Sequence, residues 1–199
     1  MRPAIPNADD QAGREDNELV AKALRGEGKA FHELVDRHAA GLMRLAGALV
    51  GNRADAEDVV QETFAGAFAG LAGYRGEASV KTWLTRIAVR QAAACLRKRQ
   101  RRGELARGQA KTERGLREAP GGQAAADARM DVMAAMDELS PEHREVLVLR
   151  ELEGLSYDEM AAALALPRGT VESRLFRARR AMQELLKDYL ADGVTRGKE

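Results

Sequence analysis

The sequence predicts an all-α protein in which two small helical domains are joined by a flexible linker. Three observations lead to this fold class. Almost every periodic segment repeats its apolar residues at helical spacing. No stretch alternates β-branched and polar residues in the way that a half-buried strand does. A segment rich in Gly, Ala, Gln and charge separates two groups of helical patterns, and its composition is typical of a linker.

The expected elements follow from apolar spacing, caps and punctuating glycines. In the first group, helices are expected over residues 17–24, 29–50, 54–71 and 80–102. In the second group they are expected over residues 129–139, 141–151, 157–164 and 170–190. The predicted organisation is a mobile tail over 1–15, a domain over 16–103, a linker over 104–128, a second domain over 129–190 and a C-terminal tail over 191–199. A linker of this length makes one compact domain unfavourable.

Charge is balanced over the whole chain but not along it. The 32 basic and 31 acidic residues leave a net charge of +1. Locally, residues 97–118 hold nine basic residues against three acidic ones, and residues 174–180 hold four arginines and no acid. Such runs predict surfaces that bind a polyanion. The single cysteine, Cys95, excludes an internal disulfide and fits a reducing compartment. With no signal peptide and no membrane-length apolar run, a cytoplasmic protein is expected.

The strongest local signals lie between Leu155 and Met182. Ser156 and Glu159 form a capping box that starts one helix, and Pro167 interrupts it before a new helix starts at Thr170. At about 100° per residue, the new helix has two faces. One is apolar: Val171, Leu175, Ala178, Met182 and Leu186; the other carries Thr170, Ser173, Arg174, Arg177 and Arg180. This is the arrangement of a helix-turn-helix, whose second helix enters the major groove. The alternative is a plain helical hairpin with a solvated basic face.

The helix over residues 54–71 divides into an apolar and an acidic face. Val60, Phe64, Ala67 and Leu71 are expected to face the core, and the opposite side carries Asp55, Asp58 and Glu62 with Gln61 beside them. These carboxylates fit a solvated surface or a partner surface. A di-metal site would need Glu-x-x-His motifs on other helices, which His32, His38 and His143 do not provide. No metal or other cofactor is therefore expected.

Three segments in order, DAEDVVQETF, YRGEASVKTWLTRIAVRQAAACLRKRQRR and LSPEHREVLVLRELEGLSYDEMAAALALPRGTVESRLFRARRAM, resemble a bacterial RNA polymerase sigma factor of the extracytoplasmic function (ECF) type. The resemblance covers residues 17–190. It implies that the first domain is sigma region 2, which binds core polymerase and opens the −10 element, and that the second is region 4, which reads the −35 element. It also implies a protein that is not an enzyme, in keeping with the lack of a nucleophile, metal cluster or phosphate loop.

The resemblance implies roles for individual residues. The clamp helices of the largest catalytic subunit would be contacted by Asp55, Asp58, Gln61 and Glu62. The −10 DNA would be contacted by Tyr74, Ser79, Trp83, Arg86, Arg90, Arg97 and Arg101, and the −35 DNA by Arg168, Thr170, Ser173, Arg174, Arg177 and Arg180. Trp83 fits a core position equally well, because it precedes Leu84 and Ile87 at helical spacing. Arg90 and Glu172 depart from residues common in the family, asparagine and a basic residue respectively.

The expected partners are core RNA polymerase, promoter DNA and an anti-sigma protein, without membrane insertion or a small-molecule substrate. Two other interpretations are open at this point. A dimeric helix-turn-helix regulator would bind palindromic half-sites without polymerase and would leave the acidic helix unexplained. A sigma mimic would bind an anti-sigma protein without initiating transcription, and such mimics usually carry a fused receiver domain.

Overall fold

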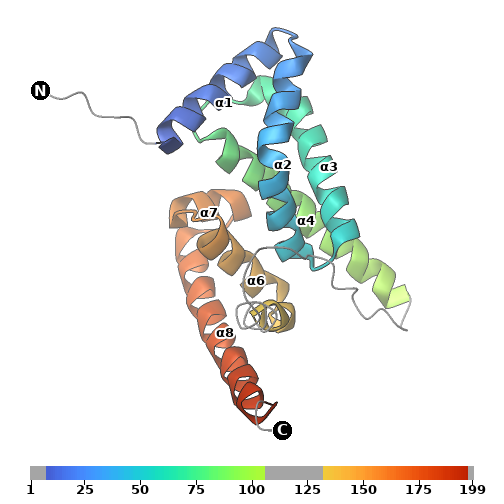
Figure 1. Ribbon diagram of the computed structural model, residues 1–199, viewed down its shortest axis with the longest axis vertical. Helices are drawn as coiled ribbons and strands as arrows, with labels where there is room; N and C mark the ends of the chain where they lie inside the picture. Colours follow the sequence, from blue (N-terminus) through green and yellow to red (C-terminus); the bar gives the residue numbers. More distant parts are fainter. Residues whose placement is uncertain (1–7, 106–131, 197–199) are drawn as a thin grey trace, which may run out of the picture. The chain divides into compact units, whose positions relative to one another are not determined.

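The computed structural model describes residues 8–105 and 132–196, with side chains over 11–102 and 132–187. Every element in these two ranges is helical, which confirms the all-α prediction (Figure 1). The chain divides into two compact units, one built from α1, α3, α4 and most of α2, the other from α6, α7 and α8. The predicted linker lies outside the described residues, apart from its first two positions, which end α4.

The first unit consists of α1 (Ala8–Leu24), α2 (Gly28–Val50), α3 (Arg53–Gly70), the short 3-10 helix η1 (Leu71–Gly73) and α4 (Val80–Leu105). Helices α3 and α4 run antiparallel, since Asp55 pairs with Arg99 while Gly66, further along α3, lies against Ile87. The core contains small and branched side chains from all four long helices, including Leu19, Val20, Leu34, Leu45, Val59, Ala67, Val80, Leu84 and Val89.

Helix α1 begins at Ala8 and not at Asn17, so the prediction of a mobile tail reaching residue 15 was wrong for residues 8–15. The reason is tertiary. Glu15 pairs with Arg37 of α2 at 2.9 Å, and buried Asp16 accepts a hydrogen bond from Nε2 of His38 at 2.8 Å. These contacts, together with buried Leu19 and Val20, hold the polar start of α1 against the rest of the unit.

The buried face of α3 is rotated from the predicted one. Ala56, Val59, Thr63 and Ala67 are buried, whereas Val60 and Phe64 are half-buried at its border. Thr63 was not expected in a core, but its hydroxyl donates to the carbonyl oxygen of Val59 at 2.6 Å, so its polar group is satisfied. Small residues suit this face because α4 packs close to it.

The second unit begins with a helical segment over residues 132–138, followed by α6 (Pro141–Leu147), α7 (Tyr157–Leu164) and α8 (Arg168–Arg196). Between α6 and α7 lies a π-helical segment, η2 (Val148–Leu152), where a single α-helix to residue 151 was predicted. Its wider turn is visible in the bond from the Glu153 amide to the carbonyl oxygen of Val148. Helix α8 also continues to Arg196, so residues 191–196 are not the tail that was expected.

The corner between α7 and α8 forms as the sequence predicts, except that α8 begins at Arg168 and not at Thr170. The Ser156 hydroxyl accepts from the Glu159 amide, while the Glu159 carboxylate accepts from the Ser156 amide, which confirms the capping box. Helix α7 ends at Ala165, whose left-handed conformation (φ 53°) turns the chain toward Pro167. Val171, Leu175 and Ala178 of α8 are fully buried, so the predicted apolar face packs into the unit.

Candidate nucleic-acid and partner interfaces

The polar face of α8 is exposed, but its residues are not equivalent. Ser173, Arg177 and Arg180 are exposed and Thr170 is half-buried. The Arg174 side chain is only 17% exposed, and its guanidinium lies 3.4 Å from the Glu142 carboxylate of α6. Arg174 stands at the border of the buried face, so its first contact is inside the unit. In the described residues, no ion pair engages Arg177 or Arg180.

Arg168 and Glu172 neutralise each other at the start of α8. Arg168 Nε donates to Glu172 at 2.9 Å, and its Nη1 lies 3.0 Å from an oxygen of Asp158 on α7. The hydrogen bond to Glu172, reinforced by Asp158, raises the pKa of Arg168. Glu172, which departs from the basic residue common in the resembled family, is therefore balanced locally by a cation.

A further ion pair of α8 and two exposed apolar side chains lie in the same unit. Arg179 lies 2.7 Å from Glu151, which joins α8 to the π-helical segment. Phe176 on α8 and Leu152 at the end of that segment are 69% and 62% exposed. Neither residue was singled out from the sequence, because the helical pattern shows only that they lie off the buried face.

The acidic face of α3 is confirmed as a surface feature. Asp58, Gln61 and Glu62 are exposed. Asp55 differs from them, because it pairs with Arg99 of α4 at 3.1 Å and its side chain is 28% exposed. Asp55 also lies beside Cys95: burial, reinforced by the Asp55 carboxylate, raises the pKa of the Cys95 thiol. A raised pKa reduces the thiolate fraction, which argues against a reactive cysteine here.

One residue of this surface was missed by sequence reasoning. Phe68 is 64% exposed and packs edge-to-face on Phe31 of α2, with ring centroids 5.0 Å apart. It follows Gln61 by two helical turns and so continues the same exposed face. Its spacing from Gln61 was available in the sequence, but a phenylalanine in a helix is normally assigned to the core.

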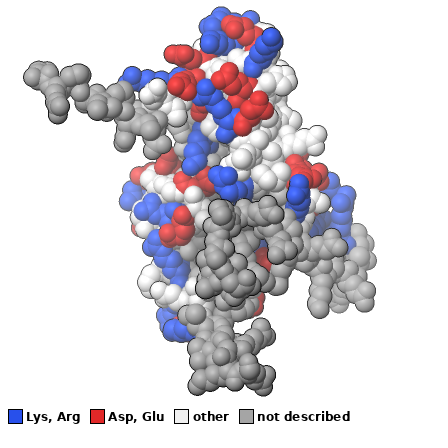
Figure 2. All heavy atoms as spheres, viewed as in Figure 1, with Lys and Arg blue, Asp and Glu red and all other residues white. Residues whose placement is uncertain are grey.

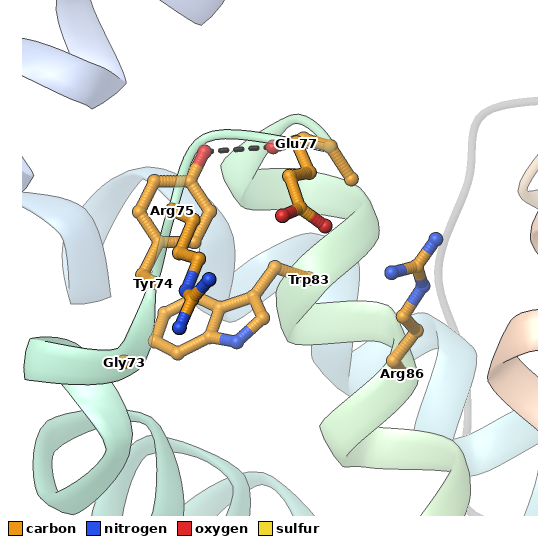
Figure 3. A pocket seen from close by; sticks show the side chains of 7 residues that line it. Gly73, Tyr74, Arg75, Glu77, Trp83 and Arg86 are labelled. Atoms are coloured by element: carbon orange, nitrogen blue, oxygen red, sulfur yellow. Dashed lines mark hydrogen bonds between the residues drawn. The ribbon is translucent and has the colours of Figure 1, made fainter.

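An open pocket of about 370 Å³ lies beside the loop that joins η1 to α4 (Figure 3). Its lining is Gly73, Tyr74, Arg75, Glu77, Ala78, Trp83 and Arg86. The Tyr74 and Trp83 rings meet at 47° with centroids 5.0 Å apart. Nε of Arg86 is buried and has no hydrogen-bond partner in the described part of the chain. The pocket thus combines aromatic surface with an arginine side chain in its lining.

Three of the predicted −10 residues come together here and the others do not. Tyr74, Trp83 and Arg86 line the pocket, and Trp83 is half-buried, so it serves both packing and the pocket wall. Ser79 caps α4 instead, its hydroxyl accepting from the Thr82 amide at 3.1 Å. The remaining three are exposed residues of α4 outside the pocket lining: Arg90, Arg97 and Arg101.

Acidic and basic side chains stand close to one another at several places on the face shown in Figure 2. This mixture agrees with the net charge of +1. Within residues 8–105 and 132–196, no His, Cys, Asp and Glu side chains gather into a possible metal site. The same part of the chain contains no helix that is long and apolar enough to cross a membrane.

An acidic face on one helical unit and a helix-turn-helix on the other define a class of protein that pairs DNA recognition with a protein partner. Comparison with known families agrees: residues 34–102 match the family described as Sigma-70 region 2, and residues 129–182 match Sigma-70, region 4. The chain belongs to the ECF RNA polymerase sigma factors. This confirms the family that the sequence motifs indicated, and fits neither the dimeric regulator nor the sigma mimic.

Two of the relatives match over nearly their whole length. The chain is 33% identical over 187 residues to the RNA polymerase sigma-H factor of Pseudomonas aeruginosa, an alignment covering 89% of this chain and 97% of that one. It is 36% identical over 184 residues to the ECF RNA polymerase sigma-E factor of Escherichia coli strain K12, with 88% and 96% covered.

Solved structures show the same fold. The sigma factor RpoE of Bartonella quintana, crystallised with the anti-sigma factor NepR, has a TM-score of 0.67 at 30% identity, covering 80% of this chain and 98% of that one. CnrH, in complex with the cytosolic domain of CnrY, has a TM-score of 0.63 at 30% identity, covering 87% and 98%.

Proposed function

We propose that the two units divide the work of promoter-specific initiation: the first binds core RNA polymerase and opens the −10 element, and the second reads the −35 element. The observation that carries this proposal is the match of both units, in order, to regions 2 and 4 of the sigma family. The proposed domains are region 2 over 16–103 and region 4 over 129–190, joined by a linker over 104–128.

The polymerase-binding surface is the exposed face of α3. Asp58, Gln61 and Glu62 supply charge and hydrogen bonds for a basic partner surface, here the clamp helices of the largest subunit. Such charges govern encounter rate and orientation more than affinity. Phe68 adds an exposed apolar anchor at the end of the same face. Asp55 supports this surface from its edge, since its carboxylate is paired with Arg99.

The −10 site is the pocket beside the η1–α4 loop. An unpaired base leaving the duplex needs a surface on which to stack, and stacking on an aromatic side chain contributes about 1–3 kcal/mol per base. Tyr74 and Trp83 offer that surface, and the terminal nitrogens of the Arg86 guanidinium can donate to the base or to its phosphate. Ser79 acts indirectly by capping α4. The exposed side chains of Arg90, Arg97 and Arg101 contact the sugar-phosphate backbone of the neighbouring DNA.

The −35 site is the exposed N-terminal half of α8. Arg177 and Arg180 are free to contact bases or phosphates, and Ser173 and Thr170 lie on the same face. Arg174 and Arg168 contact DNA after exchanging their carboxylate partners for phosphate or base oxygens. These exchanges make both residues weaker contributors than Arg177.

The protein supplies recognition and strand capture, and covalent chemistry remains with the polymerase. Working with polymerase places it in the cytoplasm. An anti-sigma protein is a further proposed partner, because both structural relatives described above were solved with a second protein bound and one of these is an anti-sigma factor. Such a partner would compete for the exposed surfaces of α3 and α8.

The test is transcription in vitro over a library of random promoters, using bacterial core polymerase with and without this protein, followed by sequencing of transcript starts. New transcripts sharing paired elements near −35 and −10 are expected. The matched control is the Asp58→Lys, Glu62→Lys variant, which should yield none. No new transcripts, together with no co-purification of core enzyme, would rule the proposal out in favour of a polymerase-independent regulator.

A further inference from the structure

A side-chain hydrogen bond connects α1 to the pocket loop. The Tyr74 hydroxyl donates to Oδ1 of Asn17 on α1 at 2.9 Å, and also approaches the carbonyl oxygen of Ala78 at 2.8 Å. Asn17 and Tyr74 are 57 residues apart in sequence. Helix α1 also packs against η1 and α4, the two elements on either side of this loop. Asn17 lies outside the segment that matches Sigma-70 region 2, which begins at residue 34.

The two partners of the hydroxyl have different effects on the loop. Ala78 belongs to the loop itself, so a bond to its carbonyl only closes the loop on itself, as the dashed line in Figure 3 shows. Asn17 belongs to another element and therefore ties the loop to the body of the unit. Because a phenol has one hydrogen, both acceptors share it unless the Asn17 amide turns to donate to the phenol oxygen. In either geometry Asn17 restricts the position of the Tyr74 ring.

Helix α1 is itself firmly held at this point. Asp16, next to Asn17, is 6% exposed and accepts from His38 of α2 at 2.8 Å, with Arg37 at 3.6 Å. Glu15 adds a bond to Arg37 at 2.9 Å. A continuous series of contacts thus runs from α2 through residues 15–17 to Tyr74, and from the Tyr74 ring to Trp83 in the pocket wall.

We propose that Asn17 is a positioning residue, through which α1 fixes the Tyr74 ring against Trp83 and sets the shape of the pocket that captures a base of the opened −10 strand. The claim that the pocket captures a base of the −10 strand rests on the proposed function. The claim that Asn17 positions the Tyr74 ring does not. Without the Asn17 amide the ring keeps only its bond within the loop, and the pocket wall moves with the loop.

Trp83 provides a direct readout, because it is the single tryptophan of the chain. The variants are Asn17→Ala, Tyr74→Phe and the double variant, with Gln11→Ala as control, since Gln11 is an exposed amide residue of the same helix. Asn17→Ala and Tyr74→Phe should each increase the quenching of Trp83 fluorescence by acrylamide. Asn17→Ala, which keeps every aromatic side chain, should also change the near-ultraviolet circular dichroism. The double variant should change no more than Tyr74→Phe, which already lacks both bonds of the hydroxyl. Gln11→Ala should match the wild type.

The functional arm uses holoenzyme and a single strand carrying the −10 element selected in the transcription experiment. Loss of one neutral hydrogen bond within the protein predicts a weakening of strand binding by Asn17→Ala of up to about fivefold, with duplex −35 binding and core binding unchanged. Far-ultraviolet circular dichroism and thermal unfolding establish that the variant folds.

The outcomes separate the two proposals. A wild-type Trp83 signal in Asn17→Ala, or additive effects of Asn17→Ala and Tyr74→Phe, would overturn the positioning role whatever the holoenzyme does. Failure of wild-type holoenzyme to bind the strand would instead overturn the −10 assignment, while the Trp83 measurements on the free chain would still decide the role of Asn17 at the pocket wall.

Discussion

Individual arginines of α8 differ in what holds them before DNA arrives. Arg168, Arg174 and Arg179 each face a carboxylate, at 2.9, 3.4 and 2.7 Å respectively. To bind a phosphate or a base, these arginines must first break the ion pair with that carboxylate. The cost of breaking it cancels part of the favourable free energy of binding DNA. Arg177 has no such partner in the described residues, and its Nε donates only to the carbonyl oxygen of Ser173. Its full interaction with DNA therefore adds to affinity.

Arg177→Ala is expected to weaken recognition of the −35 element by about 1–3 kcal/mol if the contact is bidentate to a base. The measurement is competition binding of holoenzyme to promoters with native and scrambled −35 elements. Arg179→Ala is the matched control on the same helix and should cost less, since Arg179 is paired with Glu151. An equal loss on native and scrambled promoters would show that Arg177 contacts only the backbone.

At Cys95 the structure predicts a pH dependence. Burial, then Asp55, raises the pKa of the thiol. The thiolate therefore forms at a higher pH than in a free cysteine. Alkylation by iodoacetamide should accelerate only above the pH at which a free cysteine ionises. The same shift means that folding favours the neutral thiol. Its contribution to stability is complete below the unfolded-state pKa and is lost as pH rises through the folded-state pKa.

Asp55→Asn tests the cause of the Cys95 shift. Removing the carboxylate leaves burial as the main effect, so the alkylation profile should move toward lower pH without reaching that of an unfolded peptide. A profile in the wild type that coincides with that of a short cysteine peptide would contradict the assignment of a raised pKa.

On the scale of elements, α3 carries the side chains proposed to bind polymerase on the side away from the core, so they can be changed without unfolding the protein. Asp58→Lys with Glu62→Lys should abolish co-purification with core polymerase while leaving thermal unfolding nearly unchanged, because both side chains are exposed. The control is Glu18→Lys with Asp36→Lys, two exposed acids on α1 and α2 with the same total charge change. Equal loss of binding in both double variants would indicate a general charge effect.

Helix α7 ends with an unusual residue for its backbone angle. Ala165 adopts φ 53°, a left-handed conformation that costs a non-glycine residue about 1–2 kcal/mol. Ala165→Gly should therefore raise the free energy of unfolding by about 1 kcal/mol, after the greater flexibility of the unfolded chain is subtracted. Ala162→Gly, at an exposed position in the same helix, should lower it by about 1 kcal/mol. Thermal or urea unfolding measures both.

Elements that start or stop on local signals were predictable from sequence. The capping box and Pro167 gave α7 both of its ends. Where tertiary contacts decide, sequence patterns failed. The start of α1 depends on Arg37 and His38, which lie on another helix. Three lining residues of the pocket, Tyr74, Trp83 and Arg86, were named from the sequence. The contact between Asn17 and Tyr74 was not predicted, because no local pattern reveals a bond between two distant elements.

For the molecule as a whole, a net charge of +1 conceals two surfaces of opposite sign. The basic surface is proposed to bind promoter DNA and the acidic surface core polymerase, so ionic strength should weaken both kinds of binding. Substitutions on one surface should change the salt dependence of only one of them. Arg177→Ala should reduce the salt slope of promoter binding by about one if the residue contacts a phosphate, with no change in the salt dependence of core binding. Asp58→Lys with Glu62→Lys should affect core binding alone. Fluorescence titrations at several salt concentrations measure both kinds of binding. If the surfaces were not separate, each variant would change the salt dependence of promoter binding and of core binding together.

The π-helical segment Val148–Leu152 also affects how this chain should be aligned with others. A π turn holds one residue more than the α turn it replaces, so it can absorb an insertion without disturbing the helix on either side. A relative that lacks one residue between Leu149 and Gly154 would have lost this turn and kept the helix-turn-helix. An alignment gap there therefore marks a local change of helix type, and the residues proposed to read DNA still align one to one beyond it.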